Sequence, residues 1–127
     1  MLAGSLHDRE SDRKLLDVMV AWRFWQRLRG LQLRRRLSPS QALLLVPGRS
    51  IHTCFVFFAL DVYFLDPTGL VLGSCLGLRP FRLASGPQGT QAVLEVAHSE
   101  NFRLQTGQRL RLVPAKAKLP EALAAFA

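Results

Sequence analysis

The stretch that decides the fold is LDVYFLDPTGLVLGSCLGL, residues 60–78. It holds two apolar runs, residues 60–65 and 70–78, on either side of Asp66-Pro67-Thr68-Gly69. Pro and Gly in such a tetrapeptide are typical of a tight turn, and apolar runs on both sides of it favour antiparallel strands. We therefore expect a β-hairpin here. Gly73 and Gly77 fall within its second strand, where glycines mark twist or a bulge.

Further strands are expected on both sides of this hairpin. Residues 15–21 and 41–46 are short apolar runs, and residues 51–58 are the most β-like segment of the chain. Alternation predicts two more strands at 91–97 and 109–113; in the first, Val93, Glu95 and Ala97 alternate with Leu94 and Val96. Short strands without an alternating βα rhythm favour a mostly β (α+β) domain, a small curled antiparallel sheet or a barrel-like one.

The period changes in residues 22–31. Trp22, Trp25 and Leu28 recur at three-residue steps with arginines between them, and the pattern ends near Gly30. This predicts one short amphipathic helix near the N-terminus, with both tryptophans packed into the core.

Length and composition are those of one domain. The chain has 127 residues, 49% of them hydrophobic, which is enough for a single core. We expect a flexible N-terminal segment over residues 1–14, a globular β-rich domain over 15–113, and a tail over 114–127 for which helix and loose coil both stay open. The apolar run at 54–60 is too short to span a membrane. The charged first residues lack a signal-peptide core, so a soluble, cytoplasmic protein is expected.

The net charge of +8 is distributed unevenly. Residues 18–60 contain no acidic side chain but hold seven arginines, three of them consecutive: Arg34, Arg35 and Arg36. Such a patch could steer a domain toward nucleic acid or an acidic surface, but we favour the simpler reading of a solvated basic face. The two cysteines, Cys54 and Cys75, form no CxxC pair, and we expect both to be reduced.

One segment resembles a known family. Residues 50–66 read SIHTCFVFFALDVYFLD, which is similar to the S-I-H-T-F-x-M-x-x-P-I-D-V-x-F-L-D signature of the prokaryotic family catalogued as domain of unknown function 192. Other elements agree in order along the chain: Gly30-Leu31, Leu43-Leu44-Leu45, Gly69, Pro80, Val93-Leu94-Glu95 and Gly107. The resemblance implies a compact, mostly β domain and carries no established reaction.

The sequence also departs from the family pattern. Cys54, Val56 and Ala59 replace an aromatic residue, the signature's methionine and its proline. Gln32 stands for a methionine, His98 for a frequent glycine and Gln108 for a late aspartate. Among the signature residues that remain, His52, Thr53, Asp61 and Asp66 are taken as the candidate binding site.

His52 and Asp61 are the candidates for catalysis. A histidine can act as a general base, and a nearby carboxylate can orient its ring. Because Asp61 and Asp66 lie on the strand after the one that carries His52, proximity is feasible. The structural alternative is that His52 is a hydrogen-bonded core residue, that Asp61 caps a bulge and that Asp66 opens a turn.

No cofactor or metal is expected. His7, His52 and His98 share no metal-ligand motif, and the chain has no phosphate-binding glycine loop and no nucleophile elbow.

Three functions remain open. We favour a non-enzymatic binding or accessory module, whose partner is a protein or another unidentified molecule. The alternatives are a small hydrolase that uses a His52/Asp61 pair, and a weak binder of nucleic acid or acidic surfaces through Arg34, Arg35 and Arg36. The last is the least favoured, because the basic residues are not interleaved with aromatic ones on a sheet.

Overall fold

The computed structural model describes residues 2–21, 41–52, 59–79 and 82–115. Within these ranges the chain forms nine strands: β1 (Leu2–Asp8), β2 (Lys14–Ala21), β3 (Gln41–Leu45), β4 (Ser50–His52), β5 (Leu60–Leu65), β6 (Val71–Leu78), β7 (Leu83–Ser85), β8 (Ala92–Ala97) and β9 (Leu110–Pro114). The part described here contains no helix. The predicted helix at 22–31 and the tail beyond residue 115 lie outside it.

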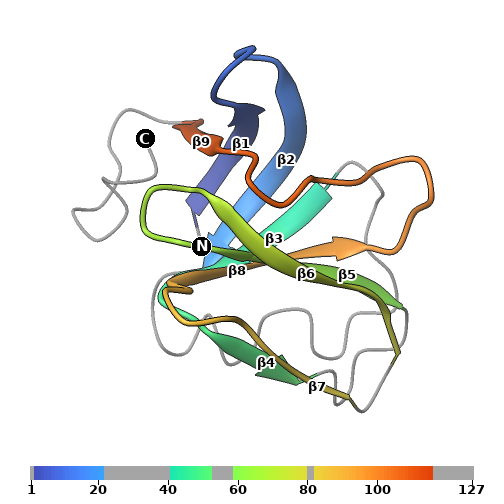
Figure 1. Cartoon of the computed structure of the whole chain (residues 1–127). Helices are drawn as coiled ribbons and strands as arrows, with labels where there is room; N and C mark the ends of the chain where they lie inside the picture. Colours follow the sequence, from blue (N-terminus) through green and yellow to red (C-terminus); the bar gives the residue numbers. More distant parts are fainter. Residues whose placement is uncertain (1, 22–40, 53–58, 80–81, 116–127) are drawn as a thin grey trace.

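Seven of the strands make one sheet in the order β6-β5-β8-β3-β2-β1-β9, and β4 and β7 form a separate ribbon (Figure 1). Only the β2–β3 pair of the large sheet is parallel. Its edge strands approach at one end, where Leu70 bridges Arg109 and the Leu110 N–H donates to the Gly69 carbonyl at 2.9 Å. The sheet is therefore strongly curled but not closed, and the barrel-like alternative is corrected to an open sheet.

The inner face of the curl holds the main core. Most of its buried side chains come from the strands of the large sheet, among them Leu6, Val18, Leu44, Tyr63, Leu94 and Leu112. Tyr63 is fully buried there, and its hydroxyl oxygen accepts a hydrogen bond of 3.3 Å from the Leu104 N–H. Because residues from both edge strands meet in this cluster, burial of apolar area maintains the curl.

A second, smaller core covers the outer face. It contains Leu43, Leu45, Leu60, Val62, Phe64 and Val93 of the large sheet, together with Ala84 of β7. Both faces of β5 and β8 are thus buried, because side chains alternate between the two clusters along each strand. The ribbon β4–β7 lies on this outer side of the sheet (Figure 1).

The structure confirms the expected hairpin as β5–β6 and the expected strands β2, β3, β8 and β9. It differs at two places. The polar first residues, expected to be flexible, form β1, which pairs with both β2 and β9 and buries Leu6. The segment between β6 and β8, for which no strand was predicted, contains β7, which pairs with β4.

No helix in the described ranges is long and apolar enough to cross a membrane.

Candidate functional site

Asp61 is the most completely buried acidic residue of the predicted site, with 1% of its surface exposed. It lies on β5 beside a bulge in β6, where the register shifts between Leu60 and Val62. The Gly77 N–H in this bulge donates to Asp61 Oδ1 at 2.8 Å, and the Ser99 N–H donates to Oδ2 at 3.4 Å. The carboxylate therefore accepts a hydrogen bond from a backbone group that the bulge removes from the strand ladder, and another from a backbone group just beyond the end of β8.

His98 completes the surroundings of Asp61. Its Nδ1 lies 2.7 Å from Asp61 Oδ1, and an ionised carboxylate only accepts hydrogen bonds, so Nδ1 donates. The His98 side chain is 37% exposed while that of Asp61 is 2% exposed. A buried carboxylate thus holds an imidazole at the surface, directly after the end of β8. A carboxylate that orients an imidazole is also one half of a general-base site.

Asp66 lies at the other end of β5, roughly 17 Å from Asp61 for a six-residue strand. Its Oδ1 accepts hydrogen bonds from the Thr68 hydroxyl at 2.7 Å, the Thr68 N–H at 2.8 Å and the Leu70 N–H at 3.0 Å. Partial burial raises the pKa of Asp66, but these hydrogen bonds outweigh it and hold the pKa below its ordinary value. Asp66 is the organising residue of the β5–β6 turn, and Asp61 and Asp66 do not share one site.

The backbone of His52 pairs with Leu83 in the ribbon β4–β7, whereas Asp61 belongs to the large sheet. Thr53 and the basic patch of Arg34, Arg35 and Arg36 lie outside the described residues. The described hydrogen bonds of Asp61 go to His98, Gly77 and Ser99. The pairing of His52 with Asp61 therefore stays a prediction.

Glu95 is a second buried carboxyl that the sequence analysis did not select. It lies on β8 and is 5% exposed. Its neighbours across the sheet are Leu43 on β3 and Val62 on β5, both in the outer core. Burial raises the pKa of Glu95 to about 8, so that most Glu95 carboxyls are protonated at pH 7.

Within the described ranges, no three His, Cys, Asp or Glu side chains are grouped so that they could hold a metal ion. Cys75 has a free thiol and is partly buried on the outer face. Cys54 is outside these ranges.

The fold and these residues define a class: a small, open, curled β-sheet domain with a buried carboxylate at a strand bulge. Residues 6–112 match the family DUF192, described as "Uncharacterized ACR". The chain belongs to this family, as its signature in residues 50–66 indicated. No curated protein matches the chain at a significant level.

Two solved structures have similar folds. One, from Sinorhizobium meliloti 1021, is described as a candidate transcription regulator. It is 22% identical, covers 87% of this chain and 92% of its own, and has a TM-score of 0.75. The other is a protein of unknown function from Novosphingobium aromaticivorans DSM 12444. It is 15% identical, covers 86% of this chain and 83% of its own, and has a TM-score of 0.72. At these identities the likeness concerns the fold alone.

Sequence reasoning missed His98 and Glu95 as site residues for different reasons. His98 is 37 positions from Asp61 along the chain, and only its departure from the family's glycine singled it out. Glu95 was placed in the alternation of β8, but the alternation alone did not indicate that its face of the strand is buried. The signal for Glu95 was a carboxyl in register with two apolar residues on neighbouring strands. That signal indicates a buried carboxyl only when both faces of the strand are known to be buried.

Proposed function

We propose that this domain is a non-enzymatic binding or accessory module. The observation that supports it best is that Asp61, the central carboxylate of the signature, is taken up by hydrogen bonds within the chain. Its oxygens accept hydrogen bonds from two backbone N–H groups and one imidazole of the same chain. A carboxylate held in this way stabilises the junction of β5, β6 and β8, which is a structural task.

Asp66 supports the same proposal. Its three short hydrogen bonds all close the turn between β5 and β6. Both aspartates of the signature thus have a structural explanation, and the family's residues in this region suit a scaffold that presents a binding surface. The likeness to a candidate transcription regulator is compatible with an accessory role for this chain.

A small hydrolase is the second candidate, and one observation favours it. The 2.7 Å contact between His98 Nδ1 and Asp61 Oδ1, with the imidazole partly exposed, is the arrangement of a base oriented by a buried acid. In this version His98 takes the role that the sequence analysis gave to His52, and Asp61 keeps its role.

Turnover assays with the full chain separate the two candidates. The substrates are p-nitrophenyl acetate and p-nitrophenyl phosphate, and the variants are His98→Gln and His52→Gln. The binding module predicts that the wild type and both variants hydrolyse each compound at the same background rate. A general base contributes about 10²- to 10⁴-fold to a rate. Hydrolysis by the wild type that falls at least 100-fold in either variant would overturn the proposal in favour of the hydrolase.

A further inference from the structure

A serine and a histidine lie side by side on β1, outside the site around Asp61. Ser5 and His7 are two residues apart on the strand, so both project from the face of the sheet opposite to the buried Leu6. Ser5 Oγ lies 3.0 Å from His7 Nε2. Both residues are partly exposed, so the pair is open to solvent.

The carbonyl of Asp12, in the turn between β1 and β2, fixes which nitrogen of His7 carries the proton. His7 Nδ1 lies 3.3 Å from this oxygen, and a carbonyl only accepts hydrogen bonds, so Nδ1 donates. In a neutral imidazole Nε2 is then the acceptor, and the Ser5 hydroxyl donates to it. A hydroxyl, a base and a group that orients the base are thus connected in the order that activates a serine as a nucleophile.

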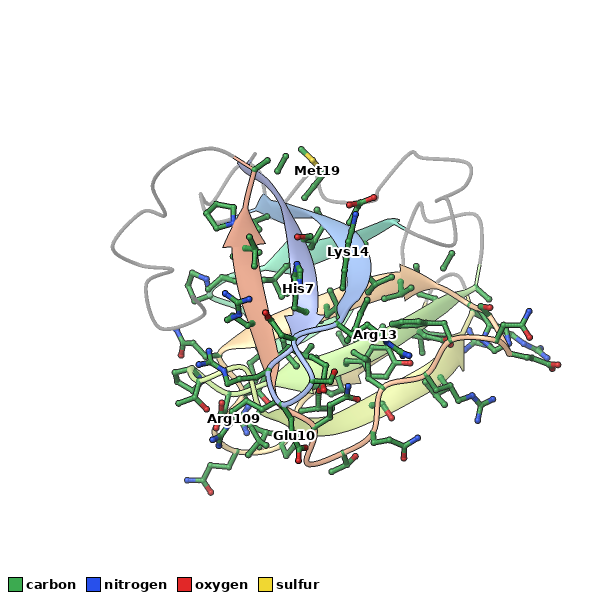
Figure 2. All side chains as sticks on the ribbon, turned by 90° about the horizontal axis from the view of Figure 1, so that it is seen from above. His7, Glu10, Arg13, Lys14, Met19 and Arg109 are labelled. Atoms are coloured by element: carbon green, nitrogen blue, oxygen red, sulfur yellow. The ribbon has the colours of Figure 1, made fainter. Side chains whose placement is uncertain are left out.

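Two cations flank His7 on the neighbouring strands. The registers pair His7 with Lys14 on β2 and with Arg111 on β9, and Figure 2 shows His7 and Lys14 on their adjacent strands. Lys14 Nζ lies 2.7 Å from Asp17 Oδ1. Arg111 forms an ion pair with Asp12. Because both ion pairs are exposed to solvent, these cations stabilise a negative charge beside His7 only weakly.

The backbone at Ser5 is already used in the sheet. β1 lies between β2 and β9, and Ser5 is in register with Asp17 on one side and with Val113 on the other. The N–H groups of a strand that is paired on both sides belong to its ladders, whereas strong stabilisation of an acyl-transfer oxyanion needs donors that are free to face it. The site therefore suits attack on an acyl group with a good leaving group, and it gives little help to hydrolysis of the resulting ester.

We propose that Ser5 is a covalent acceptor site for activated acyl groups, such as those of aryl esters, with His7 as the base. This inference rests on the proposed binding function and makes the binding covalent. Ser5 Oγ forms a bond to the acyl carbonyl carbon, its proton passes to His7 Nε2, and the bond from that carbon to the leaving group breaks. The proton then passes from Nε2 to the leaving group or to solvent. The products are an ester on Ser5 and the free leaving group.

The test mixes the full chain with p-nitrophenyl acetate. It follows the release of p-nitrophenolate by absorbance and the acetylation of each serine by mass spectrometry of peptides. We expect a burst of about one equivalent per chain, an acetyl group on Ser5, and the background rate afterwards. Ser5→Ala should abolish the burst, and His7→Gln should slow it at least about tenfold, because a general base contributes about 10²- to 10⁴-fold to a rate. The control Ser74→Ala, at an exposed serine of β6, should react as the wild type does.

Ser11 is an internal control on the same hairpin. Its hydroxyl donates to Asp8 Oδ2 at 2.7 Å, and a carboxylate is a weaker base than an imidazole, so acetylation of Ser11 should be much slower than that of Ser5. This comparison is made in the wild type and does not depend on the folding of a variant. The inference fails if Ser5 is not acetylated, if Ser11 is acetylated as fast, or if folded His7→Gln reacts at the wild-type rate.

This test and the test of the proposed function have different readouts. No ester on Ser5, together with background rates in the wild type, His98→Gln and His52→Gln, would reject this inference and leave the binding module standing. Continuous hydrolysis that is lost in Ser5→Ala would show that the ester does not persist, and would overturn the covalent binding site in favour of an enzyme. Hydrolysis that falls in His98→Gln or His52→Gln, without an ester on Ser5, would reject the binding module itself.

Discussion

Glu95 makes the stability of the domain depend on pH. An exposed glutamate has a pKa of 4.5, and burial raises the pKa of Glu95 to about 8. Between these values the native state holds a proton that the unfolded chain has released, so rising pH favours the unfolded chain. Below pH 4.5 both states are protonated and the penalty is absent; above pH 8 it is complete.

We therefore predict that Glu95→Gln becomes more stable relative to the wild type as the pH rises from 5 to 8. The difference in free energy of unfolding should grow by an amount on the order of a few kcal/mol. Urea unfolding of both proteins at pH 5 and pH 8 measures it. An equal difference at the two pH values would show that Glu95 is not protonated in the folded state.

Asp61 and His98 should contribute unequally to stability. Asp61→Ala removes a buried carboxylate and leaves the half-buried Gly77 N–H without its acceptor, so it should lower the free energy of unfolding by about 2–4 kcal/mol. His98→Gln removes a partly exposed partner and should cost about 1 kcal/mol or less. Equal costs in denaturant titrations would mean that the contact with His98, rather than the bulge in β6, accounts for the role of Asp61.

At the scale of elements, two turns of the sheet contain glycines with a left-handed backbone: Gly69 between β5 and β6, and Gly107 before β9. Gly69 has a φ of +86°, and a Cβ there would collide with the Leu110 carbonyl oxygen. That oxygen is part of the backbone where the two edges of the sheet meet, next to the Leu70–Arg109 bridge. Gly107 has a φ of +92° but faces open space. Both positions have the left-handed conformation, but only a Cβ at Gly69 would meet a neighbouring backbone atom.

Gly69→Ala and Gly107→Ala are therefore a matched pair. We predict that Gly107→Ala lowers the free energy of unfolding by about 1 kcal/mol, the typical cost of the left-handed conformation for alanine. Gly69→Ala should cost at least about 2 kcal/mol more, because the junction of β6 with β9 must shift. Thermal or urea unfolding gives both values. Similar losses would indicate that the approach of the sheet edges contributes little to stability.

At the scale of the whole molecule, charge decides how the domain meets polyanions. Figure 2 shows Glu10, Arg13 and Arg109 near the end of the sheet where β1 turns into β2. Charges of both signs meet at this end, and Asp12 forms an ion pair with Arg111. This part of the surface is therefore no uniform basic patch, and Arg34, Arg35 and Arg36 remain the basic run to test.

We predict that the full chain binds a 20-base-pair DNA duplex only weakly, with an affinity that falls steeply between 50 and 200 mM salt. Each phosphate contact that is lost should reduce the slope of log affinity against log salt by about 0.9. Replacing Arg34, Arg35 and Arg36 together by alanine should then lower the slope, measured by fluorescence anisotropy, by up to about 3. A salt-independent affinity would contradict this electrostatic explanation.

The sequence by itself determined the features that depend on neighbouring residues. Turn chemistry at Asp66-Pro67-Thr68-Gly69 and apolar runs on both sides predicted the β5–β6 hairpin, and alternation predicted β8 and β9. The roles of Asp61 as the cap of a bulge and of Asp66 as the first residue of a turn were also foreseen as structural alternatives. Local periodicity and hydrogen-bonding chemistry carry all of this information.

Only the tertiary structure decided which strands pair and therefore which polar groups meet. β1 looked too polar to be ordered, yet it is held between β2 and β9, and β7 is too short to be recognised without its partner β4. His98 reaches Asp61 because β8 lies beside β5, and Glu95 is buried because a second layer covers the outer face of the sheet. Strand order and the covering of a sheet face arise from contacts between residues far apart in the sequence, which local patterns do not encode.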